Sequence, residues 1–114
     1  MAESLVDIQL EDLKRVELVR VSGRIDSSNA AEFDRVLKEV VSRKQNVVLE
    51  LSGVEYISSA GLRAIVALWR ECQKHRGDVL LANPSERVVE VLTLAGLNSI
   101  FKTYDNETAA VGSF

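Results

Sequence analysis

The sequence contains very few of the residues that build disulfides, metal centres and hydrolytic sites. Its 114 residues include one cysteine, Cys72, and one histidine, His75. A single cysteine excludes an intramolecular disulfide and a multi-thiolate metal site, and a single histidine excludes the usual two- or three-histidine metal sites. A Ser-His-Asp triad would have to use His75, and there is no glycine-rich nucleotide-binding motif. We therefore expect a protein without catalytic residues, metal or cofactor.

An excess of positive charge and a long hydrophobic run are also missing. The chain carries 14 basic and 17 acidic residues, which gives a formal net charge of −3. Nucleic acids and anionic membranes attract basic surfaces, so neither is an expected partner. The longest apolar run, residues 64–69, is far shorter than the about 20 residues of a membrane-spanning helix, so direct membrane insertion is not expected. The first residues lack the apolar stretch of a signal peptide, which favours a cytoplasmic protein.

What the sequence does contain is the composition of an ordinary globular domain. Hydrophobic residues make up 46% of the chain and charged residues 27%, which is a typical balance for a protein with one packed core. We find no linker, low-complexity stretch or internal repeat. Residues 1–114 are therefore interpreted as a single domain.

Strand-like and helix-like segments alternate along the chain. Period-two or dense apolar patterns predict strands at residues 4–10, 16–21, 47–51, 79–82 and 100–104. Helical periodicity predicts three helices. The first follows a capping box of Asn29 and Glu32, with Ser27 or Ser28 as other possible caps. The second lies between Gly61 and Gly77, and the third is capped by Asn83 with Pro84 in its first position. The tail from Asp105 is expected to fray.

The order of these elements predicts the fold class. Strands alternating with helices in the second half require right-handed crossovers and parallel neighbours. The opening pair of strands reads as a hairpin and makes the sheet mixed. We therefore expect an α/β domain with a five-stranded, mixed but mostly parallel sheet and helices mainly on one face.

The candidate site is a loop of small residues between a buried strand and a helix, Ser58-Ser59-Ala60-Gly61. Small side chains let another molecule approach the backbone, and a phosphate on a serine there would meet the free amides of the first helical turn. Asp26 ends an earlier strand and is expected at the same sheet edge. The ordinary alternatives are that the serine is a plain helix cap and that Asp26 merely turns the chain.

The polar face of the second predicted helix adds to this site. Four residues at a spacing of four, three and four positions form one stripe that starts beside Ser59, namely Arg63, Ala67, Arg70 and Lys74. Such a stripe could meet an acidic groove on a partner, or it could be a solvated helix face.

At this point the residues resemble a known family. The run from Val47 to Leu62, the element Gly23-Arg24-Ile25-Asp26 and the segment from Asn83 to Phe101 are similar to motifs of the STAS domain family, which includes bacterial anti-sigma factor antagonists. The similarity extends over about residues 5–104. In the family's Asp-Ser-Ser/Thr-Gly loop the first serine is phosphorylated, and that position is Ser59 here. Ser58 replaces the aspartate and is the second choice for the modified residue.

The resemblance implies a mechanism. The unphosphorylated antagonist binds an anti-sigma factor that is also a serine kinase, which frees a sigma factor, and a PP2C-type phosphatase reverses the phosphorylation. The residues expected to contact the partner are Asp26, Ser27, Asn29, Ser58, Ser59, Ala60, Gly61, Leu62 and Arg63. An accessory STAS subunit of a membrane transporter or of a larger signalling complex is the alternative from the same family. A small enzyme or nucleotide-binding protein is a further class.

Overall fold

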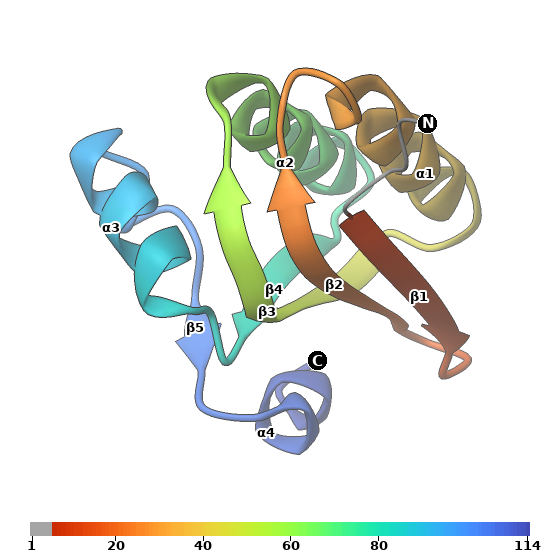
Figure 1. Ribbon diagram of the computed structural model, residues 1–114. Helices are drawn as coiled ribbons and strands as arrows, with labels where there is room; N and C mark the ends of the chain where they lie inside the picture. Colours follow the sequence, from red (N-terminus) through yellow and green to blue (C-terminus); the bar gives the residue numbers. More distant parts are fainter. Residues whose placement is uncertain (1–5) are drawn as a thin grey trace.

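Five strands form one sheet in the computed structural model, which describes residues 6–114. They are β1 (Val6–Asp12), β2 (Glu17–Ile25), β3 (Asn46–Ile57), β4 (Asp78–Ala82) and β5 (Thr103–Tyr104). The strands follow one another across the sheet, and β1 is antiparallel to β2 whereas the other neighbours are parallel (Figure 1). The expected α/β fold with a mixed, mostly parallel sheet is confirmed.

Helices cover the two faces of the sheet unequally. The helices are α1 (Ala30–Arg43), α2 (Ser59–Lys74), α3 (Glu86–Leu94) and α4 (Glu107–Gly112). The buried faces of α1, α2 and α3 join one large core with the inward residues of β2, β3 and β4. On the opposite sheet face, a smaller core contains the fully buried Ala110 of α4 (Figure 1). Most helices therefore lie on one face, as expected.

The fourth helix corrects the prediction that the tail from Asp105 frays. The side chain of Asn106 caps α4 by accepting a hydrogen bond from the amide of Ala109 at 2.8 Å. Arg20 of β2 holds Glu107 through Nε–Oε2 and Nη2–Oε1 contacts of 2.7 and 3.0 Å. The prediction was wrong because the helix depends on a distant arginine and on the apolar sheet face, which no local pattern reveals.

Two of the predicted helix caps are also different. Asn83 adopts a left-handed conformation (φ 47°), and Ser85 caps α3 instead, accepting from the amide of Val88 at 3.3 Å. Asn29 does precede α1, but its side chain forms no cap hydrogen bond. It is held by the backbone of the preceding loop, so the capping box with Glu32 is absent. Ser85 is also held by a distant hydrogen bond to the carbonyl of Val54, whereas Asn29 is held by residues of the loop just before it.

The strand boundaries differ from the predictions where the sheet is irregular. The predicted strand ends at Leu51, but β3 continues for six more residues to Ile57. The pairing of β2 with β3 continues this far because bulges shift its register after Arg20 and after Gly23. At the first of these bulges, a Cβ on Gly53 would lie 2.7 Å from the Cβ of Ser22. β5 is limited to Thr103–Tyr104 instead of beginning at residue 100. Of the predicted first strand, residues 4 and 5 lie outside the described part, and β1 continues to Asp12.

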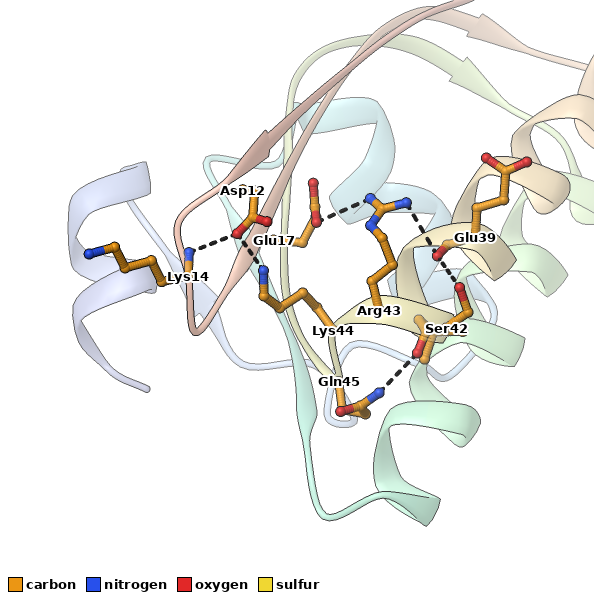
Figure 2. A network of polar contacts seen from close by, with 9 residues as sticks. Asp12, Lys14, Glu17, Glu39, Ser42, Arg43, Lys44 and Gln45 are labelled. Carbon is orange, nitrogen blue, oxygen red and sulfur yellow. Dashed lines mark hydrogen bonds and ion pairs between the residues drawn. The ribbon is translucent and has the colours of Figure 1, made fainter.

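Ion pairs join the β1–β2 hairpin to the end of α1 at the amino-terminal edge of the parallel strands (Figure 2). Lys44 contacts the carboxylate of Asp12, and Arg43 Nη2 lies 3.2 Å from Oε1 of Glu17. Glu17 is 1% exposed, so its charge is almost completely removed from water. This network fixes the end of the sheet opposite to the candidate site.

Candidate functional site

The loops that follow β2 and β3 lie side by side at the carboxyl edge of the sheet (Figure 1). Ile25 and Ile57, the last residues of these strands, are direct partners in the sheet. The amide of Ser58 donates a hydrogen bond to the carbonyl of Ile25 at 2.8 Å. Asp26 and Ser58 therefore leave the sheet from adjacent positions, and the expectation that Asp26 and the serine loop share one edge is confirmed.

The two serines of the loop have different environments. Ser58 is the N-cap of α2, and its Oγ accepts a hydrogen bond from the amide of Gly61 at 3.1 Å. Ser59 is the first residue of the helix and is exposed. Within residues 6–114 its hydroxyl has no hydrogen-bond partner. The cap function belongs to Ser58, so the hydroxyl of Ser59 is free to react or to bind.

Gly61 brings the start of α2 close to the ends of the strands. A Cβ on this residue would lie 2.6 Å from Cγ2 of Ile25 and 3.0 Å from Cγ1 of Ile57. Atoms at these distances overlap, and both isoleucines belong to the core. Gly61 is buried, so it positions the loop and does not itself face a partner.

The loop after β2 is organised from inside by Asn29, which is 4% exposed. Its Oδ1 accepts from the amide of Asp26 at 3.0 Å, and its Nδ2 donates to the carbonyl of Arg24 at 2.9 Å. Asp26 accepts from the hydroxyl and the amide of Ser28 at 2.6 and 2.9 Å, and these hydrogen bonds hold the pKa of Asp26 below its usual range. Asp26 therefore presents a carboxylate that stays ionised beside the serine loop.

The basic stripe on α2 lies between two shallow grooves. All four of its residues are exposed, as expected for one helix face. On the α1 side, Arg63 and Ala60 face Ser27 and Asp34. The second groove is lined by Ser59, Leu62, Arg63, Val66, Ala67, Arg70 and Leu97. Arg63 thus borders both grooves and stands beside Ser59.

The charges of this stripe are unevenly paired. Lys74 forms an ion pair with Glu71 at 2.9 Å. Arg63 and Arg70 form no ion pair or hydrogen bond with any residue from 6 to 114. Two arginines that have no partner among residues 6–114 and lie beside apolar side chains form a surface suited to an acidic binding partner.

The second groove includes two residues that the sequence did not indicate. Val66 could have been found, since it lies one helical turn after Leu62. Leu97 had no such signal because it follows α3 and reaches the groove only through the tertiary fold.

Metal binding, thiol reactivity and membrane-spanning helices are three further possibilities for the described part of the chain. Among residues 6–114, no three histidine, cysteine, aspartate or glutamate side chains gather as metal ligands. Cys72 is buried, which raises the pKa of its thiol to about 12 and leaves it unreactive near neutral pH. No helix within this range is long and apolar enough to cross a membrane. Ser59 and Ser27 each present an exposed hydroxyl at this surface, and that of Ser59 lies at the start of α2.

Comparison with known proteins shows which family the chain belongs to. The model of the STAS domain matches residues 7–110. The chain belongs to the STAS domain family. BtrV of Bordetella bronchiseptica, provisionally named an anti-sigma factor antagonist, is 32% identical over 95 residues, which is 82% of each chain. The crystal structure of an anti-sigma factor antagonist from Mycobacterium paratuberculosis has a TM-score of 0.84 at 27% identity and covers 95% of this chain and 92% of its own.

Two further similarities are to a solved structure of the same fold and to a much longer chain. The phosphorylated form of SpoIIAA, a cell fate determinant of Bacillus, has the same fold, with a TM-score of 0.77 at 19% identity over 94% of this chain and 98% of its own. A high affinity sulfate transporter of Stylosanthes hamata is 27% identical over 90% of this chain, but this covers 18% of the transporter. The chain therefore matches antagonists over nearly their full length, whereas it matches only a small part of the transporter. Anti-sigma factor antagonists are binding proteins without enzymatic activity.

Proposed function

We propose that this STAS protein is an anti-sigma factor antagonist controlled by phosphorylation of Ser59. In the unmodified state it binds an anti-sigma factor that is also a serine kinase, and this binding releases a sigma factor. The observation that carries the proposal is the exposed Ser59 hydroxyl at the start of α2, the helix that bears Arg63 and Arg70. Within residues 6–114 neither this hydroxyl nor the two arginines have a hydrogen-bond or ion-pair partner. Similarity to antagonists over most of both chains supports the same assignment.

The switch uses one phosphoryl group. The kinase transfers the γ-phosphoryl group of ATP to Oγ of Ser59, the hydroxyl proton is released, and ADP leaves. A metal-dependent phosphatase of the PP2C type hydrolyses the phosphate ester with water, which restores the hydroxyl and releases inorganic phosphate. An ATP-dependent kinase and a sigma factor as partners place this cycle in the cytoplasm.

Ser59 is favoured over Ser58 as the modified residue because its oxygen has no structural role. The oxygen of Ser58 already accepts the amide of Gly61, and a bulky phosphate on it would have to fit around this cap. A phosphate on Ser59 leaves the cap in place. We therefore expect the phosphorylated domain to stay folded.

The effect on binding is electrostatic and steric. Phosphoserine carries about −1.5 to −2 charges near neutral pH. A partner surface packed over this loop would have to bury or oppose that charge. A hundredfold loss of affinity corresponds to about 2.7 kcal/mol, which an unfavourable buried charge readily supplies.

The residues proposed to contact the partner divide into two groups. Asp26, Ser27, Ser58, Ser59, Ala60, Leu62 and Arg63 are exposed or half-buried and can touch it directly. Asn29 and Gly61 are buried, and we assign them the task of holding the two loops in the geometry that the partner recognises.

An accessory role on a transporter or in a larger signalling assembly is the alternative. The sulfate transporter similarity supports it only as a part of a much longer chain, because the match covers 18% of that protein. The match to BtrV covers 82% of both chains. This difference in coverage favours the antagonist.

Phosphorylation and binding can be tested together. The protein is incubated with its candidate anti-sigma factor kinase and ATP, and mass spectrometry locates the added phosphate. We expect it on Ser59 in the unaltered protein and in Ser58→Ala, and none in Ser59→Ala. Ser59→Asp should weaken binding to the kinase whereas Ser59→Ala should not. Phosphate on Ser58 alone, or full binding by the genuinely phosphorylated protein, would refute the proposal.

A further inference from the structure

Arg63 lies where its side chain can bind a phosphate group on Ser59 of the same chain. The two residues are separated by one turn of α2, and side chains four positions apart lie on the same helix face about 6 Å apart. The negative group would lie on the amino-terminal side of the positive one, which is the more favourable order. Both residues line the same groove.

The groups around Arg63 leave it available for this contact. Asp34 of α1 borders the groove on the other side, but its Oδ2 is paired with Lys38 Nζ at 2.9 Å. Asp26, in the neighbouring loop, accepts two hydrogen bonds from Ser28. Arg63 is unpaired within residues 6–114, and the carboxylate of Asp34 across the groove already has a partner, so Arg63 can bind a new anion.

We propose that phosphorylation of Ser59 pairs the phosphate with Arg63 inside the chain, and so withdraws this arginine from the partner. The inference rests on the proposed function for the identity of the modified serine. It adds a second effect to the switch, because the partner meets a new negative charge and loses the cation that borders both grooves. The planar guanidinium fork can donate two parallel hydrogen bonds to phosphate oxygens, whereas an ammonium group acts as a point charge without this geometry.

Arg70 and Arg24 provide the matched comparisons. Arg70 belongs to the same stripe and is also unpaired within residues 6–114, but it lies two helical turns, or about 10 Å, beyond Arg63. Arg24 is the second-last residue of β2 and stacks over the ring of Tyr56 at 4.7 Å from its centroid. A general effect of positive charge would involve all three arginines, whereas an i,i+4 pair involves Arg63 alone.

The experiment measures the phosphate directly. Phosphoserine is installed at position 59 by synthesis or genetic encoding, and its second ionisation is followed by phosphorus NMR in the unaltered sequence and in Arg63→Gln, Arg63→Lys, Arg70→Gln and Arg24→Gln. We expect Arg63→Gln to raise the pKa of the phosphate by about 0.3 or more, Arg63→Lys to raise it less, and the other two to leave it unchanged. Equal values in Arg63→Gln and the unaltered sequence, or an equal shift in Arg70→Gln or Arg24→Gln, would overturn the inference.

This measurement is independent of the partner. If no kinase modifies Ser59, the proposed function fails while the titration still reports whether the pair forms. If the kinase modifies Ser59 and the titration shows no effect of Arg63, the switch acts through the phosphate alone and this inference fails.

Discussion

Gly61 and Ile25 are packed so closely that a methyl group on the glycine would lie 2.6 Å from Cγ2 of the isoleucine. The contact joins the first turn of α2 to the last residue of β2. It fixes the position of the first turn of α2, which carries Ser59, and it explains why the loop must contain a glycine at position 61.

Replacing Gly61 by alanine should therefore displace the start of α2. We expect Gly61→Ala to reduce the free energy of unfolding by about 1 to 3 kcal/mol, because overpacking a filled core forces side chains and backbone to shift. Chemical denaturation measures the change. Gly112→Ala is the control, since a Cβ there meets nothing within 4 Å. An equal effect of both substitutions would contradict the packing argument.

The division of roles between the two serines gives a second prediction. Ser58→Ala removes the side-chain cap of α2 and should cost about 1 kcal/mol of unfolding free energy. Ser59→Ala removes a hydroxyl without a partner in the described chain and should change it by less than about 0.5 kcal/mol. Thermal or urea unfolding of the two variants provides the comparison. A larger loss for Ser59→Ala would mean that the serines have been assigned the wrong roles.

The buried carboxylate of Glu17 depends on Arg43 (Figure 2). Arg43→Ala leaves this almost fully buried acceptor without its cation and should reduce stability by about 1 to 2 kcal/mol. Arg35→Ala breaks the exposed i,i+4 pair with Glu39 on the same helix and should cost less than about 0.5 kcal/mol. The idea fails if urea denaturation gives the two variants the same stability.

Acid should weaken the contact that holds α4 to the sheet. Hydrogen bonds from Arg20 hold the pKa of Glu107 below its usual value of 4.5. A lowered pKa in the folded state means that this contact stabilises the protein above the usual pKa and is lost as the pH falls through the lowered one. Glu107→Gln should therefore lower the melting temperature at pH 7, and its curve should converge with that of the unaltered protein only once the pH has fallen below that lowered pKa. Parallel curves at all pH values would show that Glu107 acts through packing alone.

The predictions from the sequence succeeded where a feature depends on neighbouring residues. The dense apolar run at residues 47–51 indicated a central strand, and the spacing of Phe33, Leu37 and Val40 indicated a helix face, which the structure buries completely. Alternation of strands and helices was enough to place Asp26 and the serine loop at one edge, because parallel strands end on the same side.

The failures share a physical cause, which is competition from distant partners. Asn83 has the composition of a cap, but Ser85 is the residue whose hydroxyl also donates to the carbonyl of Val54 at 2.7 Å, and this tertiary bond selects it. The tail from Asp105 is polar and small, yet Arg20 and an uncovered apolar sheet face make it a helix. No local pattern contains either partner.

By itself, the sequence determined the order of the elements, the class of the sheet and the presence of a small serine-containing loop before a basic helix, because periodicity and chain connectivity are local properties. The tertiary structure decided which serine caps α2, which arginines have no partner among residues 6–114, and that Leu97, which follows α3, lines the groove. Those properties depend on distances between segments far apart in the chain, and such distances exist only once the core has packed.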